Sequence, residues 1–361
     1  MNPNNKLRNL IGQSEGIAYL ALPPWCYPSA LNTLAFLDTT SLKAVAEKPV
    51  SSSLKETEAL LKAISTNGLD NGFYVAEHFG LKECFANLLA FRQNSPFGYL
   101  LRRRFVSEIR CYGLESILVG KERGSFFESL AAGSWTDMHS HLILPMLGQT
   151  ITAIPPSLDS EELLRQNREN AILSLGVSAD PIFGQYIGYK EECGNPNSLA
   201  PTLAVVTLES TLKNLKGIPF KLITGKGLPA KWTGIEVVFK QQFASANQPS
   251  RLVFRHHPDE GICLYFNVKK PNSKELQQVK MEFTYESAFH QVNEPAYVKL
   301  FRQILVEGDT SSLMSAGEAI AALRVAEEAI DAGRGSSLVH YPIGTWPLDK
   351  DLLPLECQGW V

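Results

Sequence analysis

The stretch "LKAVAEKPVSSSLKETEALLKAISTNGLDNGFYVAEH", residues 42–78, places an amphipathic helical pattern between two short apolar runs. The runs at 42–49 and 72–78 have the length and the Gly and Pro boundaries of buried strands. Between them, Ser53 and Glu56 have the spacing of a helix capping box. The stretch therefore predicts a strand–helix–strand unit.

The same alternation extends toward the N-terminus. "GIAYLALPP" (16–24) has the pattern of a buried strand, and "YPSALNTLAFLD" (27–38) has that of a helix. Strands that alternate with helices predict a parallel sheet with helices on its faces. Ligands of such sheets bind at the carboxyl ends of the strands. Here these ends are Pro23–Pro24, Lys48–Pro49 and Glu77–His78.

The pattern changes after residue 200, where strand-like runs follow one another without helices between them. They are "LAVVTLE", "PFKLIT", "GIEVVFKQQF", "RLVFRHH", "GICLYFNVKK" and "VKMEFTYE". A final helix is predicted between a Ser315/Glu318 capping box and Gly333. Sequential strands favour an antiparallel sheet, with helices against it.

The expected fold class is α+β with two parts. Residues 1–76 form a partial α/β, Rossmann-like part, and residues 77–361 form a domain with a large antiparallel sheet flanked by helices. No internal repeat or heptad pattern suggests another architecture.

Composition excludes several classes of function. The chain has 361 residues, a net charge of −3 and 44% apolar residues, and its longest basic run is "RRR". We therefore expect neither nucleic acid nor a membrane as a partner. Its six cysteines include no C-x-x-C pair, and "MNPNNKLRNLIGQSEG" has no apolar core typical of a signal peptide, so a reducing cytoplasm is the expected location.

Several motifs, in order, resemble those of the glucose-6-phosphate dehydrogenase family from about residue 16 to the end. "IAYLALPP" resembles "FYLALPP", "AEKP" resembles "EKPFG", and "AEHFGLKECFANLLAFR" resembles "IDHYLGKETVQNLLALRF". Later, "GIPFKLITGKGLP" resembles "GVPFYLRTGKRLP", "HPDEGICLYFNVKKP" resembles "QPDEGIxLxFxxKxP", and "YPIGTWPLDKDLL" resembles "YPAGSWGPxxADxL". The order and spacing make the resemblance specific.

The resemblance implies oxidation of glucose 6-phosphate with NADP, in the pentose phosphate pathway. It assigns His78 and Lys82 to the substrate phosphate, where an imidazole and a cation just beyond a strand can converge on one dianion. Phe79 stands where the family has tyrosine, so a hydroxyl donor worth roughly 1.5–3 kcal/mol is missing.

Three further lysines are assigned by the resemblance. Lys48 lies between substrate and coenzyme in the family, before a proline whose peptide bond is typically cis. Lys226 and Lys231 match two cations that hold the sugar, although the family has arginine at position 231 and its planar fork is absent here.

The stretch "SWTDMHSHLILP" (134–145) resembles the family's "RDMVQNHLLQL", in which a histidine takes the proton of the sugar hydroxyl. The family's aspartate and histidine are five residues apart, whereas Asp137 precedes His139 by two and His141 by four. On a helix, spacing four still places Asp137 and His141 on one face. We therefore expect Asp137 to orient His141 as the base, with His139 as the second candidate.

A remote alternative is a metal-dependent hydrolase. On an extended strand, Asp137, His139 and His141 would share one face as metal ligands. The consecutive strands after residue 200 do not fit the eight-fold βα barrel that such enzymes use.

The family's "GxxGDLxxRKL" turn, which holds the coenzyme pyrophosphate, has no counterpart in the sequence. The expected function is therefore sugar-phosphate binding with lost or impaired dehydrogenase activity and doubtful NADP binding. An active but altered dehydrogenase, or another phosphosugar enzyme, is the alternative. We expect a homodimer or association with a full-length homologue, and a cover over the exposed sheet edge.

Overall fold

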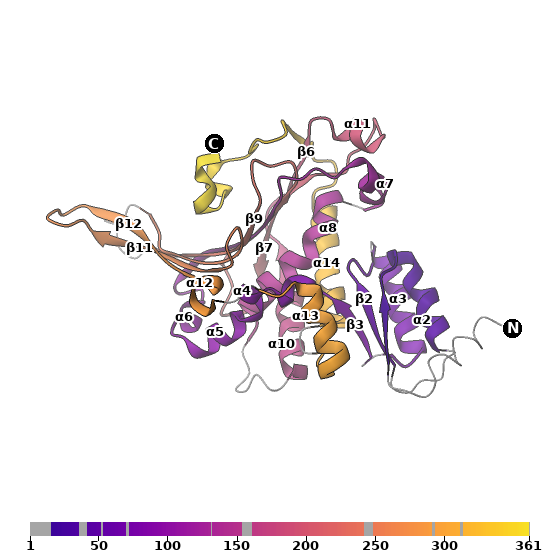
Figure 1. Ribbon diagram of the computed structural model, residues 1–361. Helices are drawn as coiled ribbons and strands as arrows, with labels where there is room; N and C mark the ends of the chain where they lie inside the picture. The colour runs from indigo at the N-terminus through magenta and orange to yellow at the C-terminus, as the bar shows by residue number, and fades with distance from the viewer. Residues whose placement is uncertain are drawn as a thin grey trace.

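The computed structural model describes residues 16–35, 42–51, 53–69, 72–130, 132–153, 161–241, 248–290, 293–310 and 313–360. Two sheets lie on either side of a group of helices (Figure 1). The smaller sheet contains the N-terminal strands, and the larger one contains most of the remaining strands.

The small sheet has the order β1-β2-β3-β13. Its first three strands, β1 (Gly16–Leu20), β2 (Leu42–Glu47) and β3 (Phe73–Ala76), are parallel, as predicted. The short β13 (Met314–Ser315) pairs with β3 in the antiparallel direction, so a segment from late in the chain covers this edge. Residues 1–15 of the predicted N-terminal part lie outside the described residues.

Helices cover both faces of the small sheet. Ala44 and Ala46 pack in the cluster that includes residues of α2 (Tyr27–Ala35) and α3 (Leu54–Thr66), whereas Val45 packs with Leu300 of α13 (Ala296–Arg302). This alternation follows from the two-residue period of a strand. Ser53 accepts a hydrogen bond from the Glu56 amide and caps α3, as predicted.

The large sheet has ten strands in the order β12-β11-β10-β9-β4-β8-β7-β6-β14, with β5 beside β7. Their bounds are β4 (Val106–Leu114), β5 (Leu175–Val177), β6 (Ile182–Tyr186), β7 (Leu203–Ser210), β8 (Phe220–Gly225), β9 (Trp232–Phe239), β10 (Arg251–His257), β11 (Gly261–Lys269), β12 (Leu276–Thr284) and β14 (Val339–Tyr341).

The prediction of an antiparallel sheet was wrong at two places. Strand β4 inserts between β8 and β9 and runs parallel to β8, and β14 runs parallel to β6. The strands β8 and β9 are adjacent in sequence but are not paired, because β4 arrives from an earlier part of the chain. The sheet is therefore mixed, and a large sheet flanked by helices is the part of the prediction that holds.

The faces of the large sheet have different covers. On one face, side chains of β4, β8 and β9 pack in one cluster with the central helices α8 (Gly133–His141), α10 (Glu161–Leu173) and α14 (Ala316–Ala332) and the π-helical turn η3 (Leu142–Gly148). On the other face, Tyr112 and Val253 share a cluster with Trp346, Leu353 and Cys357 of the C-terminal segment. The β11–β12 hairpin projects away from the body (Figure 1).

The remaining helical segments are short, apart from the central helices. They are η1 (Pro24–Cys26), η2 (His78–Leu81), α4 (Glu83–Ala86), α5 (Leu88–Asn94), α6 (Phe97–Leu100), α7 (Lys121–Ser129), α8 (Gly133–His141), η3 (Leu142–Gly148), α9 (Gln149–Ile151), α10 (Glu161–Leu173), α11 (Tyr189–Cys193), α12 (Tyr285–Phe289), η4 (Gln303–Glu307), α14 (Ala316–Ala332), η5 (Lys350–Leu352) and η6 (Leu355–Trp360).

Helix α14 has the predicted Ser315/Glu318 capping box and ends at Gly333. Throughout the ranges given above, each helix is too short or too polar to span a lipid bilayer.

Helix α8 is the element that positions the candidate site, and all nine of its residues are buried. Its first residue, Gly133, has φ +43°, and a Cβ there would lie 2.3 Å from the Pro201 carbonyl oxygen, so the entry to the helix requires glycine. After His141 the helix widens into η3, which contains Pro145. Proline has no amide hydrogen to donate to the carbonyl four residues earlier, which accounts for the change of helix type.

Candidate active site

The centre of the site is a buried hydrogen bond between Glu77, which directly follows β3, and His141 at the end of α8. His141 Nδ1 lies 2.5 Å from Glu77 Oε1, and the side chains are 3% and 0% exposed. The same oxygen accepts a hydrogen bond from the Phe79 amide at 3.2 Å. When the Glu77 carboxyl is ionised it can only accept, so the proton of the imidazole lies on Nδ1 and Nε2 is left as an acceptor.

The environment keeps the His141 imidazole neutral. Burial lowers the pKa of His141 well below its ordinary value, and nearby Lys48 lowers it further. Burial also raises the pKa of Glu77, against the attraction of His78 and Lys48. A neutral imidazole with one nitrogen fixed as a donor is the form that can remove a proton.

The predicted Asp137–His141 pair is therefore not the one that orients the imidazole. Four residues along α8 place the two side chains near each other, but the Asp137 carboxylate faces three cations instead. Its oxygens lie 3.4 Å from Lys48 Nζ, 3.6 Å from an Arg123 nitrogen and 3.8 Å from Lys226 Nζ. The sequence pattern along one helix could not reveal a partner just after β3, 64 residues away.

The cations around Asp137 stabilise its charge. Burial opposes ionisation, but Lys48, Lys226 and Arg123 outweigh it and hold the pKa of Asp137 at about 2. Lys48 also donates to the Asp137 carbonyl oxygen at 2.9 Å, and its peptide bond with Pro49 is cis, as expected. The predicted site residues Lys48, Lys226 and Asp137 thus form one ion-pair network.

Within this network, Lys226 is the most enclosed cation. Its side chain is 2% exposed and forms an ion pair with Glu115. Glu115 takes one of the three N–H donors of Lys226, so a sugar hydroxyl could accept another only where it reaches this enclosed side chain. Glu115 and Arg123 were not predicted; an acid one residue beyond β4 and an arginine in α7 carry no recognisable signal in the sequence.

His78 lies beside the central pair. Its ring stacks on Tyr297 at 5.0 Å and meets the His141 ring edge-on at 4.9 Å. Burial lowers the pKa of His78 to about 3, and the neighbouring His141 ring further disfavours a proton there, so this imidazole is neutral in the free protein. Phe79 stacks on His141 with ring centroids 4.0 Å apart and supplies an apolar wall in place of a hydroxyl.

Two predicted lysines, Lys82 and Lys231, lie near this region, and Lys82 is within electrostatic reach of His78 and His141. Burial lowers the pKa of Lys82, Glu260 opposes that shift, and Lys231 adds to it, so the two predicted lysines are within electrostatic reach of each other. Lys231 is exposed and Lys82 is half-buried. The structure brings Lys48, His78 and Lys82 around the base, with Lys231 farther out.

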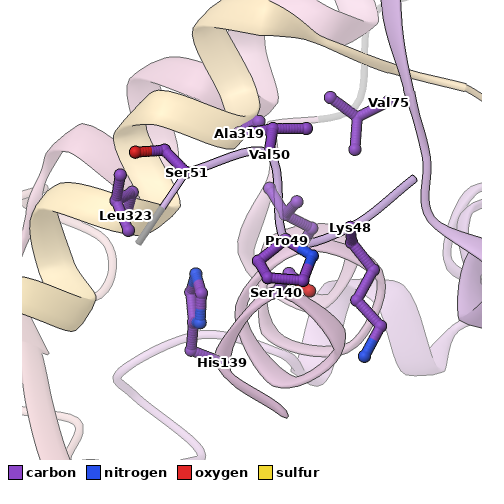
Figure 2. A pocket seen from close by; sticks show the side chains of 10 residues that line it. Lys48, Pro49, Val50, Ser51, Val75, His139, Ser140, Ala319 and Leu323 are labelled. Atoms are coloured by element: carbon purple, nitrogen blue, oxygen red, sulfur yellow. The ribbon is translucent and has the colours of Figure 1, made fainter. Parts of the chain in front are cut away.

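His139 has a different environment. Its Nδ1 donates to the Thr136 carbonyl oxygen at 2.9 Å, within α8, and burial lowers its pKa to about 4. The side chain borders a cavity of about 20 Å³ with Lys48, Pro49, Ser140 and residues of α14 (Figure 2). That volume is enough for about one water molecule. The cavity is too small for a sugar.

The alternative of a metal site at Asp137, His139 and His141 depended on an extended strand, on which the three side chains would share one face. The stretch is helical, so residues two apart do not share a face. Within the described ranges, the group of potential ligands that includes His141 contains Glu77 and His78 instead, with ligand atoms within 4.8 Å of one another.

Comparison with known proteins gives this arrangement a context. The fold is shared with solved glucose-6-phosphate dehydrogenases. The structure of glucose-6-phosphate 1-dehydrogenase from Mycobacterium avium superimposes with a TM-score of 0.83, at 21% identity, over 95% of this chain and 75% of that one. A glucose-6-phosphate dehydrogenase solved in complex with its substrate glucose 6-phosphate gives a TM-score of 0.84, at 22% identity, over 94% and 76% of the two chains.

Sequence comparisons identify the family itself. Residues 89–354 match the family profile "Glucose-6-phosphate dehydrogenase, C-terminal domain". Glucose-6-phosphate 1-dehydrogenase of Chlamydia muridarum is 31% identical over 77% of this chain and 59% of its own length. The Borreliella burgdorferi enzyme is also 31% identical, over 82% of this chain and 67% of its own. The chain belongs to the glucose-6-phosphate dehydrogenase family, and it spans less than two thirds of the length of the Chlamydia muridarum relative.

Proposed function

We propose that the chain binds glucose 6-phosphate or a close relative, with the phosphate beside His78 and Lys82 and the sugar beside His141 and Lys48. The convergence of these side chains on the Glu77–His141 pair is the observation that carries the proposal. One relative of the same fold has been solved with glucose 6-phosphate.

The charges suit a phosphate dianion. Lys82 and Lys231 are cations. A bound dianion would also raise the pKa of His78 and favour its protonated form, which is a further charged donor. Phe79 offers no hydroxyl to the phosphate, so we expect weaker binding than with a tyrosine there, by roughly 1.5–3 kcal/mol.

His141 is the proposed base. Its Nδ1 is held by Glu77, so Nε2 can accept the proton of the sugar hydroxyl at carbon 1. Lys48 and Asp137 hold each other beside the base. When bound, NADP would supply the hydride acceptor.

The described residues give the coenzyme little support. The turns after β1, β2 and β3 begin with Ala21-Leu22-Pro23, Lys48-Pro49 and Glu77-His78, and these three turns contain no glycine-rich cradle for a pyrophosphate. These three turns therefore offer the pyrophosphate of NADP no backbone cradle. We propose that the chain by itself has impaired dehydrogenase activity.

An active dehydrogenase is the second candidate, and the Glu77–His141 hydrogen bond favours it. The spacing of four residues between Asp137 and His141 predicted a misplaced base. The His141 imidazole nevertheless has a carboxylate partner, which is Glu77.

Thermal unfolding with glucose 6-phosphate tests binding. A concentration of 100 times the dissociation constant should stabilise the fold by about 2.7 kcal/mol. Lys82→Ala should weaken the effect, and Lys62→Ala, an exposed lysine of α3, should leave it unchanged. A melting temperature that millimolar phosphosugars do not move would refute the binding proposal.

Reduction of NADP by the purified chain separates the two candidates. We expect no measurable turnover. Steady formation of reduced coenzyme that His141→Asn abolishes would establish the second candidate instead.

A further inference from the structure

A second group of reactive side chains lies beyond the phenyl ring of Phe79. Cys84 is in α4, His256 is near the end of β10, and Glu260 precedes β11. Their ligand atoms all lie within 4.8 Å of one another, although Cys84 and Glu260 are 176 residues apart in sequence. The fold therefore brings a thiol, an imidazole and a carboxylate to one point.

One of these groups, the His256 imidazole, has unused bonding capacity. His256 Nδ1 is buried and has no hydrogen-bond partner among the described residues. It lies 3.4 Å from Glu260 Oε1, a long contact in which the two groups attract each other. A buried ring nitrogen without a partner is costly, and a ligand would relieve that cost. The Cys84 side chain is also buried, in a residue that is 1% exposed.

The carboxylate is already oriented. Glu260 Oε1 accepts from the Cys84 amide at 3.1 Å, and Asn293 Nδ2 donates to Oε2. Outer hydrogen bonds of this kind fix the direction of a metal-ligating side chain.

Thiolate, imidazole and carboxylate together form a ligand set for Zn²⁺ and not for Ca²⁺ or Mg²⁺, which prefer oxygen. Tetrahedral zinc with bonds of about 2.0–2.3 Å needs ligand atoms about 3.5 Å apart. The three ligand atoms lie within 4.8 Å, and His256 Nδ1 and Glu260 Oε1 are already 3.4 Å apart, so small side-chain rotations would achieve this spacing. A bound cation would also keep the Cys84 sulfur deprotonated.

The charge beside this group favours a metal that a thiolate can neutralise. Lys82 is close enough to Glu260 for that carboxylate to raise the pKa of the lysine, against the effect of burial. A hard cation held by one carboxylate would be repelled by Lys82, whereas a thiolate adds a second negative charge.

The group is distinct from the candidate active site. Phe79 stacks on His141 at 4.0 Å and meets the His256 ring edge-on at 6.0 Å, so its ring lies between the two imidazoles. We propose that Cys84, His256 and Glu260 form a zinc site that fastens α4, just after Lys82, to the β10–β11 turn. A water molecule would complete the coordination.

The test uses the full chain, reduced and freed of metal by chelation. Zinc is added, excess is removed by dialysis, and bound zinc is measured by elemental analysis. We expect one equivalent for the unaltered chain and a loss of that equivalent in Cys84→Ala and His256→Asn. Cys26→Ser and His257→Asn, matched changes outside the group, should retain it.

Two further measurements keep the proposal open to refutation even if a variant fails to fold. Cobalt bound to the unaltered chain should show a thiolate-to-metal charge-transfer band, and cobalt binding without that band would overturn the proposal. His141→Asn should retain the zinc equivalent. Loss of zinc in His141→Asn with retention in Cys84→Ala would place the metal at Glu77, His78 and His141 instead.

Discussion

Replacing Glu77 with glutamine tests the central pair directly. Glutamine has nearly the shape of glutamate, and the Glu77 side chain is fully buried, so packing is kept while the charge is removed. Glu77 Oε1 serves both His141 Nδ1 and the Phe79 amide, and Oε2 has no hydrogen-bond partner among the described residues. The amide must therefore place its NH₂ group in one of these two positions.

Each placement has a cost. If the amide oxygen faces His141, its NH₂ takes the Oε2 position near the Ser140 hydroxyl, and the negative charge that faces the imidazole is lost. If the NH₂ faces His141, it donates to Nδ1 and forces the imidazole proton onto Nε2, which can then no longer act as a base. A hydrogen bond to a charged group contributes about 1.5–3 kcal/mol and a neutral one about 0.5–1.5 kcal/mol, so the expected loss of stability is about 1–2 kcal/mol.

Urea denaturation measures the stability, and nitrogen-15 NMR of the histidine rings reports which nitrogen of His141 is protonated. Any turnover should fall on the order of a hundredfold or more, as when the tautomer of a catalytic histidine is lost. Glu83→Gln is the matched control, since its ion pair with Lys299 is partly exposed and contributes about 1 kcal/mol or less. An unchanged His141 tautomer together with unchanged stability in Glu77→Gln would refute the assignment.

Three other outcomes are expected. The buried His139 has a pKa of about 4, against 6.5 in the unfolded chain, so between pH 6.5 and pH 4 only the unfolded state gains this proton. The free energy of unfolding should therefore fall by about 2 kcal/mol between neutral pH and pH 5. His139→Asn should remove that part of the pH dependence in denaturation curves. Asp137→Asn removes a carboxylate whose pKa is held at about 2 rather than 3.8, so urea unfolding at pH 7 should show a loss of about 2 kcal/mol, and equal stability would contradict the ion-pair network. Light scattering at micromolar concentration should give twice the mass of the chain, and a monomer alone would refute the proposed homodimer.

The local patterns were sufficient for most elements. The period-two and period-3.6 patterns predicted the three parallel strands, the helices between them and the six strands after residue 200, because burial of apolar side chains follows those periods. Ser53, Ser315 and Gly333 marked helix ends, since capping is a local interaction. The motifs around Lys48, His78 and Lys82 gave the family and the region of the site.

The sequence by itself determined which residues could be buried, which could end a helix and which motifs the chain carries. Only the tertiary structure decided that β4 separates β8 from β9, that Glu77 rather than Asp137 holds His141, and that Cys84 meets His256 and Glu260. Periodicity specifies the face on which a side chain lies, but the order and register of strands specify what it faces. Partners separated by 64 or 176 residues are set by that order, because no local pattern connects them.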